Sequence, residues 1–180
     1  MVLKSKLEGS SVEYKIGERI GKMKDVVVDV TDAKWPITGL VVSPGFGQGE
    51  VIVTVPNVVK LDEKDSNMLA VGADAVISKE VLDVSSRTHM KLDFIDNLPV
   101  FSSDGVKVGK IYDVDIATSI RPWKAKKLLV KRESSSKDKS KRMRLDVRHV
   151  TNVSDKGVRL DFSSSQVDNL WAGDDDVGPY

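Results

Sequence analysis

Short runs of alternating apolar and polar residues, separated by turn signals, fill most of the chain. A period of two residues predicts β-strands that bury one face against a core. In the N-terminal half, strands are expected over residues 12–16, 23–30, 37–42, 50–55, 58–61 and 68–71. Many short strands of this kind indicate a small barrel or sandwich, so we expect a mainly β protein.

The strand pattern occurs twice along the chain. Residues 20–42 align without a gap onto residues 108–130, with seven identical positions among 23. The identities are Gly21/Gly109, Lys22/Lys110, Asp25/Asp113, Val26/Val114, Trp35/Trp123, Leu40/Leu128 and Val42/Val130, an offset of 88. The match resumes at an offset of 92, where Thr54 meets Asp146, so the second copy has four more residues in one connection. A repeat of this length predicts two related units in tandem.

Turn and composition signals divide the chain further. We expect a first domain over residues 8–74, a linker over 75–97 that is either a short helix or extended, and a second domain over 98–163. Residues 164–180 are polar and acidic and are predicted to be a flexible tail. The recurrence of Gly21 and Gly109 just before a strand favours a backbone role for both.

Composition narrows the class of protein. Each half of the 180-residue chain is near the lower size limit for independent stability, so contact between the halves or oligomerisation is expected to help. The chain has no cysteine, which excludes disulfides and thiolate sites. It shows no signal-peptide core and no apolar stretch of membrane-spanning length. We therefore expect a cytoplasmic protein without direct membrane insertion.

The formal charge of +1 conceals a local excess of positive charge. Residues 121–148 contain twelve Lys and Arg against three Asp and Glu, a local net of +9. The candidate patch consists of Lys124, Lys126, Lys127, Lys131, Arg132, Arg142 and Arg144. It is either a solvated hairpin, a surface for an acidic protein, or a nucleic-acid surface whose binding weakens with salt.

Residues suited to catalysis or to metal binding are scarce. The chain has two histidines, His89 and His149, and no phosphate-binding loop or nucleophile motif. The repeated aspartates Asp25 and Asp113 are interpreted as holding turns or accepting backbone hydrogen bonds, with a paired carboxylate site as the alternative. We expect no catalytic residue, metal or cofactor, and no enzymatic activity.

Aromatic residues supply the candidate protein-binding positions. Trp35 and Trp123 each stand beside a proline, and are either structural residues or anchors for a partner. Leu170, Trp171 and Tyr180 stand among acidic residues near the C-terminus. Aromatic residues in a flexible acidic peptide suit folding coupled to binding, with simple fraying as the alternative.

The segments GERIGKMKDVVVDVTDAKWPITGLVV and EVIVTVPNVVKL resemble the PRC-barrel family. The second copy is similar through DGVKVGKIYDVDI and RLDVRHV, although Lys126 and Lys127 replace Thr38 and Gly39, and Arg148 replaces Pro56. The resemblance covers about residues 10–72 and 98–162. It implies two compact antiparallel β-barrels that act as interaction modules.

The resemblance also implies a function. A free-standing tandem looks most like the archaeal PRC-barrel proteins associated with FtsZ-based cell division. The expectation is therefore a non-enzymatic adaptor that forms a homodimer or pairs with a paralogous PRC-barrel protein. It would bind cell-division proteins such as SepF and be recruited to the division site. The alternative is an RNA- or ribosome-associated protein, similar to a ribosome-maturation factor, that uses the basic face of the second copy.

Overall fold

The structure is a computed structural model and describes residues 1–14, 18–45, 47–54, 58–61, 68–71, 77–78, 89–119, 122–132 and 142–173. For residues 58–61, 68–71, 77–78 and 172–173, only the backbone is described. Within these ranges the strands form one sheet of eight strands and one of seven. The prediction of a mainly β protein is confirmed.

The eight-stranded sheet, here the N-terminal sheet, is ordered β6-β7-β2-β3-β4-β5-β8, with β9 paired to β3. Its strands are β2 (Ser11–Tyr14), β3 (Arg19–Asp29), β4 (Ile37–Ser43), β5 (Val51–Thr54), β6 (Val58–Leu61), β7 (Met68–Val71), β8 (Ile77–Ser78) and β9 (His89–Lys91). Each of the six strands expected in this half overlaps one of β2–β7. Within the predicted linker, residues 77–78 form β8, whereas residues 75–76 and 79–88 lie outside the described residues.

The seven-stranded sheet, here the C-terminal sheet, is ordered β13-β12-β11-β10-β15-β14, with β1 paired to β11. Its strands are β1 (Val2–Leu3), β10 (Pro99–Phe101), β11 (Lys107–Ala117), β12 (Lys124–Lys131), β13 (Arg142–Asp146), β14 (Val150–Ser154) and β15 (Gly157–Leu160). Counterpart strands follow the same order in the two sheets, and each sheet has one parallel pair, β2·β7 and β10·β15. The sequence repeat therefore corresponds to a repeat of strand pairing.

The repeated glycines allow a close approach of two strands. A Cβ at Gly109 would lie 2.6 Å from the carbonyl oxygen of Lys131, and one at Gly21 would clash with the carbonyl of Ser43. Neither glycine has a positive φ. The predicted backbone role is confirmed, and its physical basis is the lack of space for a side chain rather than an unusual φ.

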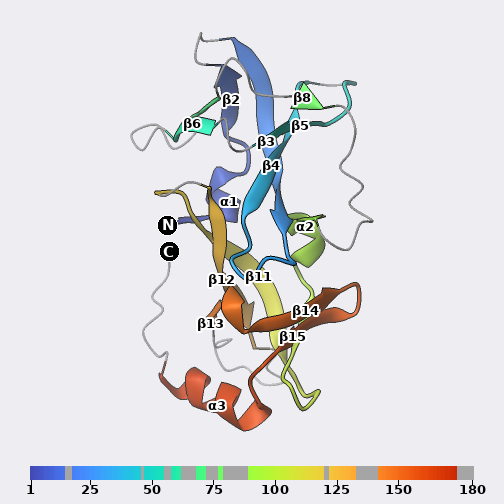
Figure 1. Ribbon diagram of the computed structural model, residues 1–180, viewed down its shortest axis with the longest axis vertical. Coiled ribbons are helices and arrows are strands. Elements are labelled where there is room, and N and C mark those ends of the chain that lie inside the picture. The colour runs from blue at the N-terminus through green and yellow to red at the C-terminus, as the bar shows by residue number, and fades with distance from the viewer. Residues whose placement is uncertain are drawn as a thin grey trace.

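The first strand of each copy pairs with a strand of the other copy. Strand β1 pairs with Asp115 and Ile116 of β11, whereas β9 pairs with Val27, Val28 and Asp29 of β3. Each is followed by a four-residue helix, α1 (Lys4–Leu7) and α2 (Leu92–Ile95). Figure 1 shows both helices at the level where the two sheets meet. Residues 89–97, assigned from the sequence to the linker, thus carry a strand and a helix.

Because the two copies exchange their first strands, the two halves of the chain share one apolar core. The main cluster of buried apolar side chains draws on both sheets and on α1 and α2, and includes Leu7, Leu40, Leu92, Leu128 and Trp171. Burial of this apolar surface is the main stabilising contribution to folding. None of the described helices is long and apolar enough to cross a membrane.

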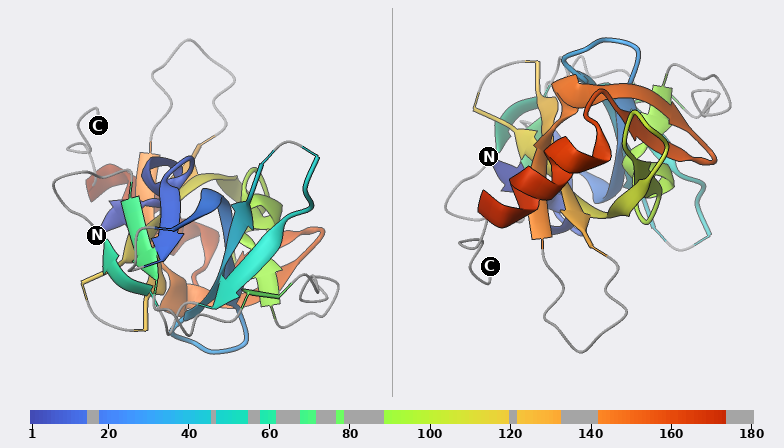
Figure 2. Two further views of the ribbon diagram at one scale, coloured as in Figure 1. Left: turned by 90° about the horizontal axis from the view of Figure 1, so that it is seen from above. Right: turned by 90° about the horizontal axis from the view of Figure 1, so that it is seen from below.

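The segment predicted to be a flexible tail is partly helical. Residues Ser164–Gly173 form α3, which lies across one end of the molecule (Figure 2). Ser163 and Gln166 form a capping box: the Gln166 N–H donates to the Ser163 hydroxyl at 3.4 Å and the Ser163 N–H donates to Gln166 Oε1 at 2.8 Å. Val167 and Trp171, four residues apart, are buried. The prediction is wrong for residues 164–173 because this apolar pair anchors the helix to the core, and residues 174–180 lie outside the described residues.

Candidate functional site

The hairpin tips that carry Trp35 and Trp123 meet at a junction between the two sheets. Ile37 N–H donates to the carbonyl oxygen of Trp123 at 2.8 Å, and Ala125 N–H donates to that of Trp35 at 3.0 Å. Because residues 35 and 123, and residues 37 and 125, are counterparts in the repeat, the two hydrogen bonds are related by pseudo-twofold symmetry. An isolated antiparallel bridge between Pro36 and Lys124 lies between them.

Both tryptophan side chains are buried at this junction, with 1% of Trp35 and 3% of Trp123 exposed. An anchor for a partner must be exposed before the partner binds. The partner-anchor interpretation of Trp35 and Trp123 is therefore wrong for this structure, and their structural interpretation is supported. Trp35 also has a φ of +45°, which is unusual for a bulky residue.

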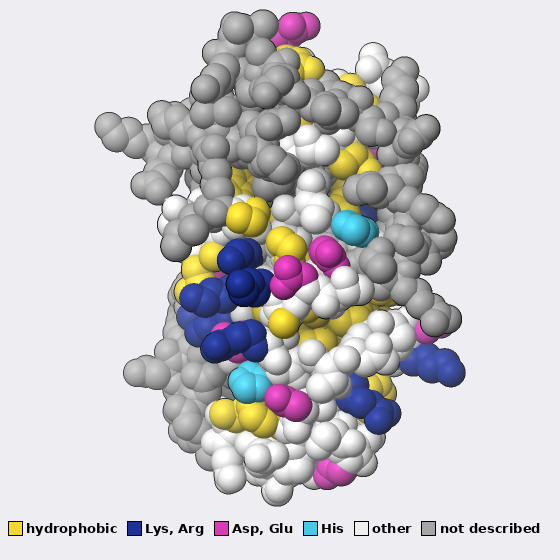
Figure 3. Space-filling view, in the orientation of Figure 1, with side chains coloured by type: hydrophobic (Ala, Val, Ile, Leu, Met, Phe, Trp, Pro, Cys, Tyr) yellow, Lys and Arg dark blue, Asp and Glu magenta, His cyan; other side chains and the backbone are white. Residues whose placement is uncertain are grey.

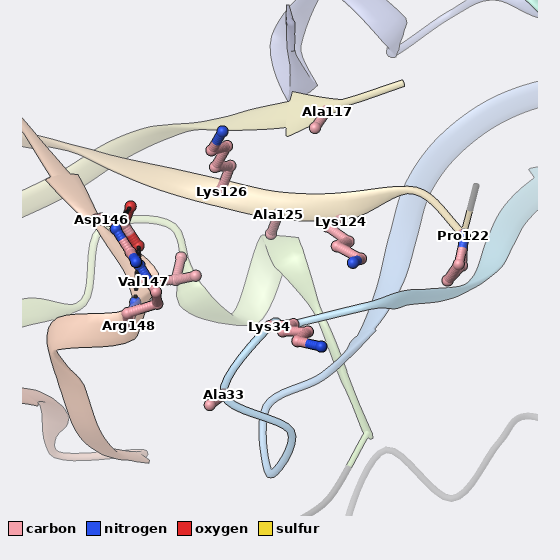
Figure 4. Close-up of a pocket in the computed structure, with 10 residues that line it drawn as sticks. All are labelled: Ala33, Lys34, Ala117, Pro122, Lys124, Ala125, Lys126, Asp146, Val147 and Arg148. Carbon is pink, nitrogen blue, oxygen red and sulfur yellow. Dashed lines mark hydrogen bonds and ion pairs between the residues drawn. The ribbon is translucent and has the colours of Figure 1, made fainter. Parts of the chain in front are cut away.

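A pocket of about 390 Å³ opens beside the junction (Figure 4). It lies between the β3–β4 hairpin, the ends of β11 and β12, and the turn after β13. Its lining consists of Ala33, Lys34, Ala117, Pro122, Lys124, Ala125, Lys126, Asp146, Val147 and Arg148. The volume lies within the range usual for ligand sites in proteins. Both copies contribute, since Lys34 comes from the first and the other cations from the second.

Positive charge dominates the lining, with four cationic side chains against one carboxylate. Arg148 is already engaged: its Nε and Nη2 atoms donate to Asp146 at 3.0 and 3.1 Å. Partial burial alone would raise the pKa of the Asp146 carboxyl, but the hydrogen bonds from Arg148 outweigh it and lower that pKa. The same pair raises the pKa of the exposed Arg148 guanidinium. Lys34 and Lys124 are left to face a ligand in the pocket.

The predicted basic patch divides between the pocket and the rest of the C-terminal sheet. Lysine and arginine side chains gather on the face over β12 and β13 (Figure 3). Of the predicted residues, Lys124 and Lys126 line the pocket, while Lys127 and Lys131 lie elsewhere on β12. Lys34 and Arg148 were not among the predicted site residues. The replacement of Pro56 by Arg148 was a readable signal, whereas nothing in the sequence connects Lys34 to the second copy.

The three predicted arginines have intramolecular partners. Arg132 Nη2 lies 3.3 Å from Asp168 Oδ1, and its guanidinium lies 5.8 Å from the ring centre of Trp171. Arg142 lies over the ring of Tyr112 at 5.3 Å. Arg144 Nε lies 3.8 Å from Asp115 Oδ2. The carboxylates of Asp168 and Asp115 offset part of the charge of Arg132 and Arg144, whereas the neutral ring of Tyr112 leaves the charge of Arg142 in place.

The predicted C-terminal anchor residues lie in different environments. Trp171 is 3% exposed and belongs to the core, so its anchor interpretation is wrong for this structure. Leu170, on the other side of α3, is 42% exposed and is the member of the set that the structure leaves at the surface. Tyr180 lies outside the described residues.

The repeated aspartates cap the exchanged helices. Asp113 accepts the N–H of Ser5 at 3.3 Å and its hydroxyl at 2.5 Å, and Asp25 accepts the N–H of Asp93 at 3.0 Å. Each also accepts the N–H of the residue that follows it, beside a bulge in its own strand. The prediction of a backbone-holding role is confirmed, because a carboxylate at a helix N-terminus satisfies otherwise unpaired donors.

Lys4 of α1 adds a charged cluster at the cap of α2, where Asp25 accepts the N–H of Asp93. Its side chain is buried, and its ammonium donates to Asp93 and, at 2.8 Å, to Asp96 Oδ2, with Asp25 Oδ1 3.8 Å away. Burial alone lowers the pKa of Lys4, but the hydrogen bonds to Asp93 and Asp96 and the charge of Asp25 outweigh it and raise that pKa.

Burial acts in the opposite sense on the carboxyl group of this cluster. It raises the pKa of Asp25 to about 6, although the N–H groups of Asp93 and Val26 and the charge of Lys4 act to lower it. The cluster joins α1, α2 and β3, so its arrangement stabilises the exchange between the two copies.

Neither histidine belongs to the lining of the junction pocket. His149 ends a 3₁₀ turn, where it contacts Asp161 at 3.2 Å and stacks against Phe162 at 4.2 Å between ring centres. Among the described residues, no group of three potential metal ligands comes together. No protein-family model matches the chain, and no curated protein matches it.

Proposed function

We propose that this chain is a non-enzymatic adaptor of the tandem PRC-barrel type that holds protein partners. The observation that carries the proposal is the junction pocket, which takes Lys34 from one copy and Lys124, Lys126 and Arg148 from the other. A duplicated unit whose copies exchange their first strands presents such a composite surface in a fixed geometry. The equal order of counterpart strands in the two sheets supports the duplication on which the proposal rests.

The resemblance supplies the biological setting of the proposal. The adaptor would act in the cytoplasm in archaeal FtsZ- and SepF-based cell division and be recruited to the division site. The test is affinity capture with the full chain from native lysate, followed by identification of the bound proteins. Recovery of SepF or FtsZ is expected. Recovery of ribosomal proteins without either of them would contradict this assignment.

Self-association is part of the proposal. Strands β13 and β14 are the two ends of the strand order in the C-terminal sheet. An end strand offers backbone N–H and C=O groups to a strand of another molecule, either a second copy or a paralogous PRC-barrel protein. Sedimentation at micromolar concentration should detect a dimer of the isolated chain. A strict monomer that also fails to pair with a paralogue would exclude this part.

A second candidate function rests on the charge over β12 and β13 seen in Figure 3. In this second candidate function, the face over β12 and β13 binds RNA or a ribosomal particle. Binding dominated by phosphate contacts should fall steeply between about 50 and about 300 mM salt. It should also be lost when Lys126, Lys127, Lys131 and Arg132 are neutralised together. A gel-shift assay that shows both effects would favour this candidate over the protein adaptor.

A further inference from the structure

We propose that the junction pocket is a docking site for an acidic peptide segment of a protein partner, with a carboxylate of the segment held between Lys34 and Lys124. This inference rests on the proposed adaptor function and names the part of the surface and the chemistry of the ligand. It is carried by the charges of the lining, by the difference between the two copies, and by the small apolar side chains of the pocket.

The first step concerns the lysines. Figure 4 shows Lys34 and Lys124 on the same side of β12, extending toward the same space. Within the described part of the chain, no hydrogen bond or ion pair engages either ammonium group. Two neighbouring ammonium groups repel each other and together favour an anion between them. A carboxylate is the anion that protein partners supply most readily.

The second step concerns Lys126, which extends from the opposite side of β12 in Figure 4. The register of β12 explains this direction. Asp115 pairs with Lys127 and Ile116 pairs with Ala125, so Lys126 is the extra residue of a bulge. A bulge turns a side chain out of the regular alternation. Lys126 therefore extends the positive surface beyond the pocket, toward a second acidic residue of an extended peptide.

The third step compares the two copies. The counterparts of Lys124 and Lys126 are Pro36 and Thr38, and the counterpart of Arg148 is Pro56. Neutral residues therefore occupy these three positions in the first copy. The junction hydrogen bonds are nearly symmetric, but these three positions carry a charge in the second copy and not in the first. A structural need common to both copies would not produce that asymmetry, whereas a ligand that binds one side would.

The fourth step separates a peptide from a nucleic acid. The described lining contains three alanines, Pro122 and Val147, and no aromatic side chain. Single-stranded nucleic acids are bound by combining positive charge with aromatic faces on which bases stack. Trp123, the aromatic residue next to the lining, is buried. Small apolar side chains instead leave room for the β- and γ-carbons of peptide residues.

The experiment selects ligands from a random twelve-residue peptide display library on the immobilised full chain. Selected peptides should be enriched in Asp and Glu. The double variant Lys34→Glu, Lys124→Glu should weaken the best peptide about tenfold or more, as reversal of two charges at the binding site requires. The matched control Lys22→Glu, Lys24→Glu makes the same charge change at two exposed residues of β3 and should leave the affinity within about twofold.

Nuclear magnetic resonance then locates the selected peptide. Its addition should shift the amide signals of Ala33, Ala125 and Val147 in the wild-type chain. No acidic enrichment, or an equal loss of affinity in the pocket and control variants, would overturn the inference. So would tighter binding of a twelve-nucleotide oligouridylate that displaces the peptide, because the pocket would then be a nucleic-acid site.

The same variants separate this inference from the proposed function. If Lys34→Glu, Lys124→Glu still captures the partner from lysate as the wild-type chain does, the pocket inference fails and the adaptor function stands. If acidic peptides bind the pocket but the wild-type chain captures no protein partner, the adaptor function fails and the pocket inference stands.

Discussion

The outer faces of the two sheets differ although their strands pair alike. In the N-terminal sheet, Val27, Val41 and Ile52 form a separate buried apolar cluster. Their counterparts in the C-terminal sheet are Asp115, Leu129 and Arg144, in which the central residue stays apolar and the outer two are an ion pair at 3.8 Å. The same backbone thus accepts an apolar face or a charged one, provided that each buried charge has a partner.

The exchanged helices differ in the same manner. Lys4 of α1 corresponds to Leu92 of α2, and both side chains are buried. Leu92 joins the apolar core, whereas Lys4 meets three carboxylates. The first copy therefore holds the exchange partly by charge and the second copy by apolar packing. The two halves should respond differently to mutation and to pH, except at the junction that they share.

The largest effect is expected at the shared junction, where the two copies should behave alike. Trp35→Ala and Trp123→Ala each remove a large buried side chain and should each lower the free energy of unfolding by about 3–5 kcal/mol. Urea unfolding measures the loss. Leu170→Ala, at an exposed position of α3, is the control and should cost less than about 1 kcal/mol. A small loss at one tryptophan and a large loss at the other would show that the junction is not symmetric.

Variants in the exchanged helices α1 and α2 should distinguish the two copies. Lys4→Met leaves the buried Asp25 carboxylate without its cation and should cost about 3 kcal/mol in urea unfolding. Leu92→Met at the counterpart position conserves an apolar side chain and should cost less than about 1.5 kcal/mol. Equal losses would mean that the charged cluster contributes no more than packing.

The pH dependence tests the same cluster from the side of Asp25. Its carboxyl has a pKa of about 6 in the folded chain against an ordinary value of 3.8. As pH rises from about 4 to about 7, the unfolded chain loses this proton first, so the wild-type chain should lose roughly 2–3 kcal/mol relative to Asp25→Asn. Below about pH 4 this contribution is fully present. Urea unfolding of both proteins at several pH values measures it, and a constant difference would contradict the raised pKa.

The smallest effect is expected at α3, which has no counterpart among the described residues of the N-terminal half. Ser163→Ala removes the side-chain cap and should cost about 1 kcal/mol. Gln166→Ala removes the reciprocal hydrogen bond. Because the two residues form one capping box, the double variant should lose less than the sum of the single losses. Additive losses in thermal unfolding would show that the two bonds are independent.

The strands were predictable because their signal is local. The short apolar segments at residues 58–61 and 68–71 mark β6 and β7 at the bounds that the structure gives. Helices α1 and α2 were not predictable, because four residues carry little periodicity and neither helix has a side-chain cap of its own. Their capping carboxylates come from the other half of the chain. The capping box and the Val167–Trp171 spacing of α3, in contrast, were readable in the sequence.

The pocket was predictable only in part. A count of charges along the chain finds Lys124 and Lys126, because they belong to one basic run. It does not find Lys34, which joins them through the contact between two hairpin tips distant in sequence. Charge counting also does not show that Arg132, Arg144 and Arg148 have acidic partners.

The exchange of first strands also constrains the order in which the chain folds. During synthesis, Val2 and Leu3 leave the ribosome well before their strand partner β11, and the cap of α1 is an aspartate 108 residues further along the chain. The first segment must therefore wait, unpaired, until much of the second half has been made. Contacts of such long sequence separation slow folding, since the loop must close before they form. During that interval another molecule's β11 can accept the same segment, which makes strand-swapped dimers the expected misfolded product at high expression.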